Sequence, residues 1–408
     1  MSEKKNWIGY FLIFVFLLVS DDSLLFGTNI NNNFILLKFV MYIAISFLIL
    51  IYIYIKKIPI QINSIRLYLV LVFLIILTAT INLDFKVGYI YRICIFGMAF
   101  LMSNLFSFEK ISHYFYRVMV FLSVYSIITF FLEIFFKNIF SSFPRIVNTA
   151  ENTYYNLFFS VIPVDNYGVP RSYSIFREPG VFVVFIILSL LLEIYFFEDK
   201  SLLKQSLLLL ALVTTKSTTG YIVVVLIYLG YLLKSSLTTK EKKIKIIFFI
   251  LSVVALYYII IHTNLIFSEN KYYSVFGKYE DIDSSNSRVA SIIINVILFF
   301  NNPFTGIGIS RVAEEFSALG LKMYGVIAEH NTNTFLIQLS TYGLVFFSIF
   351  SYQVYIFCKN INIQKNSNEI ILCLLIIFLA LSGENLSNNV MFTSLIFYTN
   401  YFKIGDSL

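Results

Sequence analysis

The sequence predicts an all-α polytopic membrane protein with about twelve transmembrane helices, two large extracytoplasmic loops and cytoplasmic N- and C-termini. Of the 408 residues, 59% are hydrophobic and only 13% are charged, which is too little charge to cover a soluble domain of this length. The apolar residues occur in runs of roughly 17 to 25, the length that crosses a hydrocarbon core as a helix. Lysines concentrate in alternate connections between these runs, as expected for loops on the cytoplasmic side.

The apolar runs divide one integral membrane domain, residues 1–408, into successive helices. No small-residue cleavage site follows the first run, so we interpret it as an uncleaved first span. The expected spans cover residues 7–20, 34–55, 65–81, 88–106, 113–136, 180–197, 202–215, 219–233, 244–266, 334–357, 369–382 and 389–402. This order places the basic cluster Lys240–Lys245 in a cytoplasmic loop, whereas a one-span error earlier in the chain would place it outside.

Two of the outer connections are long, at residues 137–179 and 268–333. Within the second, an apolar segment at 288–300 begins with Arg288 and ends before Pro303. Because it is too short to span and starts with a charge, we expect a short interfacial helix there.

Arginine is distributed differently from lysine. Most arginines fall in the two outer loops, where they oppose the topology rule: Arg145, Arg171, Arg177, Arg288 and Arg311. Guanidinium groups bind phosphate in a bidentate manner and keep their charge near lipid, so the pattern indicates an anionic ligand at the outer face. The alternative is that they pair with loop acids and only fix the loop, the candidate partners being Glu151, Asp165, Glu178, Glu280, Asp281 and Asp283.

The start of the sixth span carries a second indication of an anion site. Pro179 suits the first helical turn, and the free amides of a helix start favour an anion. Arg177 lies directly before this start and Arg171 six residues earlier. Glu178 is either a functional carboxylate or a residue that complements the helix dipole.

His330 precedes the tenth span and is flanked by Glu329 and Asn331. A neutral imidazole there could take a proton from a sugar hydroxyl, with Glu329 orienting it. The alternative is a helix cap or a solvent contact.

The composition indicates neither a metal site nor nucleic acid as a partner. The three cysteines, Cys94, Cys358 and Cys373, lie in or beside apolar runs without metal-ligand spacing. The net charge is +7, but the lysines are dispersed between spans instead of forming one surface patch. No cofactor is expected.

Taken in order, several motifs in the second half of the chain resemble the O-antigen and capsular-polysaccharide polymerase family (the Wzy type), which shares a fold with the O-antigen ligases. The resemblance rests on Arg177–Gly180 before a span, Ser217–Gly220 between two short spans, Arg288 with its apolar helix, Asn302–Gly308, His330-Asn331, Phe335–Leu339 and Tyr342–Leu344. The first five spans match only by number and hydropathy. Eleven residues separate the His-Asn pair from Gly343, where the family has about nine, so Thr332-Asn333 occupies the family position.

The resemblance implies a metal-independent glycosyltransferase of the bacterial cytoplasmic (inner) membrane. It would join undecaprenyl-diphosphate-linked repeat units into O-antigen or capsular polysaccharide, with both donor and acceptor carried by lipid in the bilayer. Arg177 and Arg288 would hold the diphosphate, Arg171 and Arg311 would assist, and His330 or Glu178 would be the base. A chain-length regulator and a flippase are candidate partners. The alternatives are an O-antigen ligase, which transfers polymer to the lipid A-core of lipopolysaccharide, and a lipid-linked oligosaccharide flippase.

Overall fold

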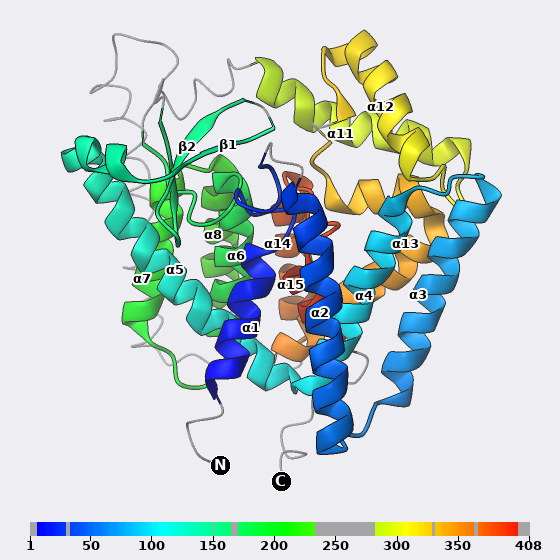
Figure 1. Cartoon of the computed structure of the whole chain (residues 1–408), viewed down its shortest axis with the longest axis horizontal. Coiled ribbons are helices and arrows are strands. Elements are labelled where there is room, and N and C mark those ends of the chain that lie inside the picture. The colour runs from blue at the N-terminus through cyan, green and yellow to red at the C-terminus, as the bar shows by residue number, and fades with distance from the viewer. Residues whose placement is uncertain are drawn as a thin grey trace.

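A computed structural model describes residues 6–29, 33–149, 151–164, 170–232, 282–328, 331–362 and 366–398. Long helices run side by side and a layer of shorter elements covers one end of them (Figure 1). The expected ninth span, 244–266, and the cluster Lys240–Lys245 lie outside the described residues. The described helices are α1 (Asn6–Leu18), α2 (Asn33–Lys56), α3 (Ile62–Ile81), α4 (Val87–Leu105), α5 (Phe108–Phe136), α6 (Pro179–Leu191), α7 (Leu202–Thr215), α8 (Thr218–Leu232), α11 (Ile282–Asn301), α12 (Ile309–Tyr324), α13 (Thr334–Ile361), α14 (Ser367–Ser382) and α15 (Val390–Ile396).

Within the described part of the chain, six helical segments are long and apolar enough to cross a membrane: Leu36–Lys56, Ile62–Ile81, Val87–Leu105, Phe108–Phe136, Pro179–Phe196 and Thr334–Ile361. Five further apolar helices are shorter, among them α1, α7, α8 and α14. The expectation of a mostly helical membrane protein is therefore confirmed at this coarser level. The last expected span, 389–402, contains only the seven-residue helix α15 among its described residues.

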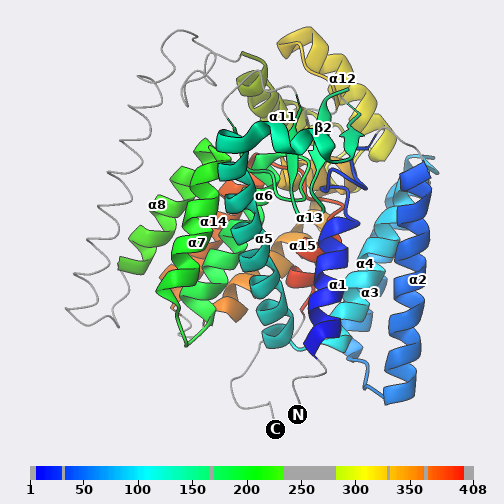
Figure 2. The ribbon, with the colours of Figure 1, turned by 60° about the vertical axis from the view of Figure 1, so that its left-hand side comes forward.

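Helix α6 is the centre of the bundle. In the segment Pro179–Phe196, 94% of the apolar window is buried inside the protein, against 22% and 28% for the spans of α2 and α3. A helix that is apolar on all sides must be surrounded by other helices, whereas the exposed apolar faces of α2 and α3 suit contact with lipid. A π-helical turn, η3 (Leu192–Phe196), follows α6 directly. Figure 2 shows α6 behind α5.

The first long loop folds into structure that the all-α prediction did not include. It contains a 3-10 helix, η2 (Lys137–Ser142), and an antiparallel sheet of β1 (Arg145–Val147), β2 (Thr153–Asn156) and β3 (Val161–Pro163) in the order β1-β2-β3. One face buries Ile146, Tyr154 and Val161 against Leu24 of the α1–α2 connection. The loop was missed because alternation over strands of three or four residues is too short to recognise in an apolar chain.

The second long loop packs against a break in α13. Gly343 has φ +78° and ψ −177°, which interrupts helix α13. Main-chain groups of α13 at this interruption bond to the turn Asn302–Gly308. Ile307 N donates to Ser340 O at 3.0 Å, Gly308 N to Thr341 O at 3.1 Å, and Leu344 N to Pro303 O at 2.8 Å. A Cβ on Gly343 would lie 2.3 Å from Phe304 O, so only glycine allows this approach.

Helices α11 and α12 lie across one end of the bundle, on the same side as the sheet (Figure 1). Helix α11 begins at Ile282, six residues before the start of the expected interfacial helix. The polar residues before Arg288 and the apolar segment after it form one continuous helix. Asp84 holds the start of α12: its carboxylate accepts hydrogen bonds from Ser310 N (2.9 Å), Ser310 Oγ (2.7 Å) and Tyr89 Oη (3.0 Å). The hydrogen bond from Ser310 N to the Asp84 carboxylate satisfies one of the free amides at the start of α12.

Candidate functional site at the start of α6

Arg177 is fixed beside Asp22, an acid from the α1–α2 connection. The two chain segments pair through Arg177 N, which donates to Asp22 O at 2.8 Å. The Arg177 Nε atom lies 3.4 Å from Asp22 Oδ1, and Asn389 Nδ2 donates to Asp22 Oδ2 at 2.7 Å. Arg177 therefore has an acidic partner that the sequence analysis did not consider. Its side chain keeps 22% of its surface accessible, so the pairing leaves part of the guanidinium open.

Glu178 is the N-cap residue of α6 and Pro179 occupies its first turn, as predicted for the start of this helix. The Glu178 side chain accepts no capping hydrogen bond. It is 56% exposed and lies 3.7 Å from Arg177 Nη1 through Oε1. A capping hydrogen bond therefore does not account for this carboxylate.

Glu384, from the connection between α14 and α15, occupies the space above that first turn. Its side chain is packed so closely on α6 that a Cβ at Gly180 would lie 1.7 Å from Glu384 Oε1. Its main chain is held by Thr334, whose Oγ1 donates to Glu384 O and accepts from Leu386 N at 2.9 Å. Glycine at position 180 thus leaves room for the carboxylate, and Thr334 fixes the main chain that carries it.

Arg288 reaches the same place from α11. A polar ladder joins α11 to the chain before α13: Ser291 Oγ accepts from Thr332 N at 3.0 Å, and Asn295 Nδ2 donates to Asn331 Oδ1 at 2.7 Å. Ser340 Oγ also donates to Asn295 Oδ1 at 2.8 Å. Positions 288, 291 and 295 share one helix face, so this buried ladder directs Arg288 toward the start of α6.

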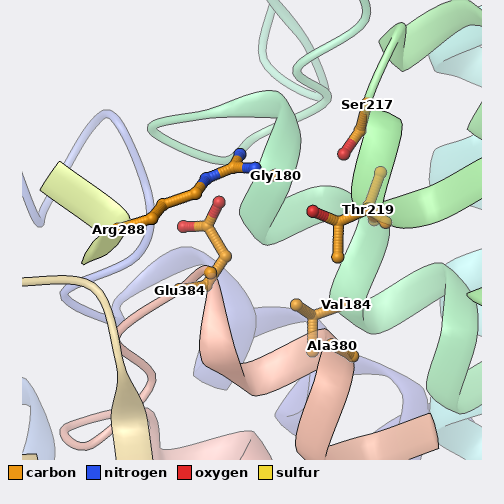
Figure 3. A pocket seen from close by; sticks show the side chains of 9 residues that line it. Gly180, Val184, Ser217, Thr219, Arg288, Ala380 and Glu384 are labelled. Atoms are coloured by element: carbon orange, nitrogen blue, oxygen red, sulfur yellow. The ribbon is translucent and has the colours of Figure 1, made fainter. Parts of the chain in front are cut away.

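A small cavity lies between these groups. It is lined by Gly180, Val183, Val184, Ser217, Thr219, Arg288, Ala380, Gly383 and Glu384. Figure 3 shows the Arg288 guanidinium above the Glu384 carboxylate, with the hydroxyls of Ser217 and Thr219 at the opposite side. Its volume of about 10 Å³ is close to that needed for one water molecule. A larger ligand would have to enter from the side of Arg288, whose side chain is exposed.

Arg171 lies next to this cavity through the connection between α7 and α8. Its Nε donates to Thr215 O at 2.9 Å, and Ser172 N donates to Thr214 O at 3.0 Å. Lys216 follows with φ +53°, a left-handed conformation that ends α7 and turns the chain toward Ser217. Burial lowers the pKa of the Arg171 guanidinium, and the charges of Glu178 and Glu384 oppose that shift.

Acidic and basic side chains lie close together in this site, and burial shifts the pKa values of several of them. Burial raises the pKa of Glu384 to about 8; Glu178 and Asp22 act in the same direction, and Arg177 and Arg288 oppose it. Burial likewise raises the pKa of Asp22 to about 6, against the effect of Arg177. Although burial opposes its charge, Asp22, Glu178 and Glu384 hold the pKa of Arg177 above its ordinary value. We refer to Asp22, Arg171, Arg177, Glu178, Arg288 and Glu384 as the cavity cluster.

The structure brings together four of the six residues named from the sequence: Arg171, Arg177, Glu178 and Arg288. Arg311 is exposed on α12 and does not line the cavity. His330 and its neighbour Glu329 lie outside the described residues. Among the described ranges, no group of three or more His, Cys, Asp or Glu side chains is placed to hold a metal ion.

The sequence analysis did not single out Asp22 or Glu384 as functional. A lone acid between two apolar segments is the signal that could have identified Glu384, because ionisable groups near a membrane are costly and often functional. Asp22 gave no such signal, since its role depends on a contact with residues far along the chain. Comparison with protein families matches no known family, and comparison with curated proteins finds no significant match.

Proposed function

We propose that this protein is a glycosyltransferase that polymerises undecaprenyl-diphosphate-linked oligosaccharide repeat units into O-antigen or capsular polysaccharide. One observation carries the proposal: guanidinium groups from two separate segments, Arg171 and Arg177 of the first loop and Arg288 of α11, converge at the start of α6. The motifs that resemble the polymerase family supply Arg177 and Arg288. The site they form suits a diphosphate, because guanidinium groups and helix amides both favour phosphate oxygens.

In this reaction the acceptor sugar hydroxyl attacks the anomeric carbon of the donor glycan, and the bond from that carbon to the lipid diphosphate breaks. Negative charge develops on the leaving diphosphate. Arg177 and Arg288 would hold this group and stabilise its charge, with Arg171 assisting from the α7–α8 connection. Arg311, which is exposed on α12, stays a candidate for an assisting contact. Glu178 stays a candidate base because its carboxylate is exposed. His330, which lies outside the described residues, also stays a candidate base.

The finer topology is part of the same proposal. The chain would cross the bacterial cytoplasmic membrane about twelve times, with both termini in the cytoplasm and with α11, α12 and the small sheet at the outer face. Lys56, Lys57 and Lys110 support this orientation, because they lie in connections assigned to the inner face. The lipid carrier would then present its diphosphate at the depth where the cavity cluster lies.

The decisive experiment deletes the gene in its host and compares surface glycan on a gel. Loss of the long ladder with a single repeat unit still attached is the expected result. Loss of every repeat, with lipid-linked polymer accumulating at the outer face, would instead identify a ligase. Lipid-linked single repeats trapped on the cytoplasmic side would identify a flippase and overturn the assignment of the arginines. Re-expression of Arg145→Ala should restore the ladder, because this arginine of the same loop stacks on Tyr155 outside the cavity cluster.

A further inference from the structure

The cavity cluster contains an acid that the proposed diphosphate site does not use. Glu384 is 8% exposed, and its carboxylate points into the cavity below Arg288 (Figure 3). No hydrogen bond to this carboxylate is found within the part of the chain that the structure describes, although its main-chain oxygen accepts one from Thr334. Enclosing an acid is costly unless neighbouring charges compensate it, and here Arg177 and Arg288 act on the carboxylate.

The surrounding chain is shaped to keep this carboxylate in place. Any side chain at position 180 would collide with Glu384 Oε1. Thr334 bonds the main chain on both sides of the acid, and Thr334 is itself the first residue of α13, which follows the buried ladder from α11. The same helix starts therefore fix both Arg288 and Glu384. An acid whose main chain is fixed beside a proposed leaving-group site is an arrangement expected of a group that takes part in proton transfer.

Glu384 is better placed for that task than Glu178. The Glu178 carboxylate is 56% exposed and lies 3.7 Å from Arg177, so it faces solvent and a cation that the diphosphate would also use. Glu384 lies in the cavity with Ser217 and Thr219, hydroxyl-bearing residues that can hydrogen-bond a sugar. A sugar hydroxyl entering beneath Arg288 would meet the Glu384 carboxylate directly.

We infer that Glu384 is a catalytic residue, the base that accepts the proton of the acceptor sugar hydroxyl; this inference rests on the proposed polymerase function. As the hydroxyl oxygen forms its bond to the anomeric carbon, its proton passes to the Glu384 carboxylate. The bond between the anomeric carbon and the diphosphate oxygen breaks, and its electron pair leaves with the lipid diphosphate beside Arg177 and Arg288. The protonated carboxyl returns its proton to water before the next cycle.

The pH dependence of the reaction follows from the groups that face Glu384. These are Arg177, Glu178 and Arg171 from the first loop, Asp22 from the α1–α2 connection and Arg288 from α11. Burial, the largest influence, raises the pKa of Glu384 to about 8. Since the base must be ionised, polymerisation by the wild-type protein should increase as the pH rises toward and through this value.

The test uses purified full-length protein in proteoliposomes, supplied with lipid-linked repeat units extracted from the deletion strain. Glu384→Gln, which keeps the size of the side chain, should lower kcat by about 10²- to 10⁴-fold and leave the half-saturating substrate concentration within about twofold. The rise in rate with pH should disappear from the residual activity. Glu314→Gln, an exposed acid on α12, is the matched control and should behave as wild type.

Wild-type kcat in Glu384→Gln, or an unchanged pH profile, would overturn the inference. Should Glu384→Gln fail to fold, Glu384→Asp decides: a reduced kcat with a displaced pH profile supports the inference, and wild-type values for both overturn it. Failure of the proposed function is distinguishable, because the wild-type protein would then form no polymer from the same repeat units.

Discussion

Two polar groups of residues lie at the same end of the molecule and differ in how far their hydrogen bonds are satisfied. The first is the cavity cluster. The second, which we call the turn cluster, comprises Thr78, Asn82, Asp84, Tyr89, Ser310 and the turn Asn302–Gly308. In the turn cluster Asn82 Nδ2 donates to Thr78 O and Gly306 O, Thr78 Oγ1 donates to Thr305 O, and Asp84 accepts three hydrogen bonds.

The cavity cluster is less satisfied. Its strongest pair, Arg177 with Asp22, is separated by 3.4 Å, and Arg288 extends over Glu384 without an ion pair among the described residues. Polar groups that are buried without partners destabilise a fold, so natural proteins rarely keep them except where a ligand completes them. The turn cluster is therefore part of the structural framework, whereas the partly open guanidinium groups of the cavity cluster suit the ligand proposed above. Substitutions in the two clusters should therefore separate activity from stability.

The largest expected effect is on activity. Arg288→Ala should lower kcat for polymerisation by about 10²- to 10³-fold, as removal of one group that stabilises developing charge does in other enzymes. Its melting temperature should change little, because Arg288 is exposed and no ion pair holds it in the described chain. Polymerisation by proteoliposomes together with thermal unfolding checks both parts. A large loss of melting temperature would move Arg288 from the ligand site to the structural framework.

Substitution of Arg177 should lower both activity and stability, and a second substitution can separate the two effects. Arg177→Ala leaves Asp22 buried without its cation, which should destabilise the protein by about 1–3 kcal/mol. Adding Asp22→Asn removes the uncompensated charge and keeps the contact with Asn389, so the double variant should recover most of the stability. Polymer should remain absent in both variants. Recovery of polymer together with stability would show that Arg177 only holds Asp22.

Next to the turn cluster, a substitution at the break in α13 should lower stability. Gly343→Ala forces a side chain into a conformation that is nearly exclusive to glycine, at a cost of order 1–3 kcal/mol, and directs it at Phe304 O. Gly325→Ala is the matched control: Gly325 also has a positive φ, +70°, but an added Cβ would meet nothing within 4 Å. Thermal unfolding should rank Gly343→Ala below Gly325→Ala. Equal stability would mean that the turn does not depend on this approach.

The smallest effect should come from Asp84. Although burial opposes ionisation, hydrogen bonds from Ser310 and Tyr89 lower the pKa of Asp84 below its ordinary value of 3.8. Its contribution is therefore present above pH 4 and is lost as the pH falls through the lowered value. Asp84→Asn should cost about 1–2 kcal/mol at neutral pH, and less at the lowest pH that the protein tolerates. A pH-independent difference in melting temperature would contradict the role of the charge, and activity per folded molecule should stay near wild type.

The features that could be predicted depend on residues that are neighbours in sequence, whereas most of those that were missed depend on contacts between distant segments. The start of α6 at Pro179 could be predicted, because proline in the first turn and the apolar run after it are neighbours in sequence. The concentration of arginines in the two long loops could be recognised for the same reason, because it is a difference in composition between loops. Asp22, by contrast, meets Arg177 only because the α1–α2 connection pairs with the segment before α6. The strands β1 to β3 were missed since nothing in their short runs distinguishes them from the surrounding apolar sequence.

The most direct test of the central claim measures binding of lipid diphosphate to the cavity cluster. The wild-type protein in lipid nanodiscs is titrated with undecaprenyl diphosphate and, separately, with undecaprenyl monophosphate, and thermal stability is followed. The account predicts a saturable stabilisation that is stronger for the diphosphate and is lost in the Arg177→Ala/Asp22→Asn/Arg288→Ala variant. Equal stabilisation of the wild-type protein and this variant would contradict it.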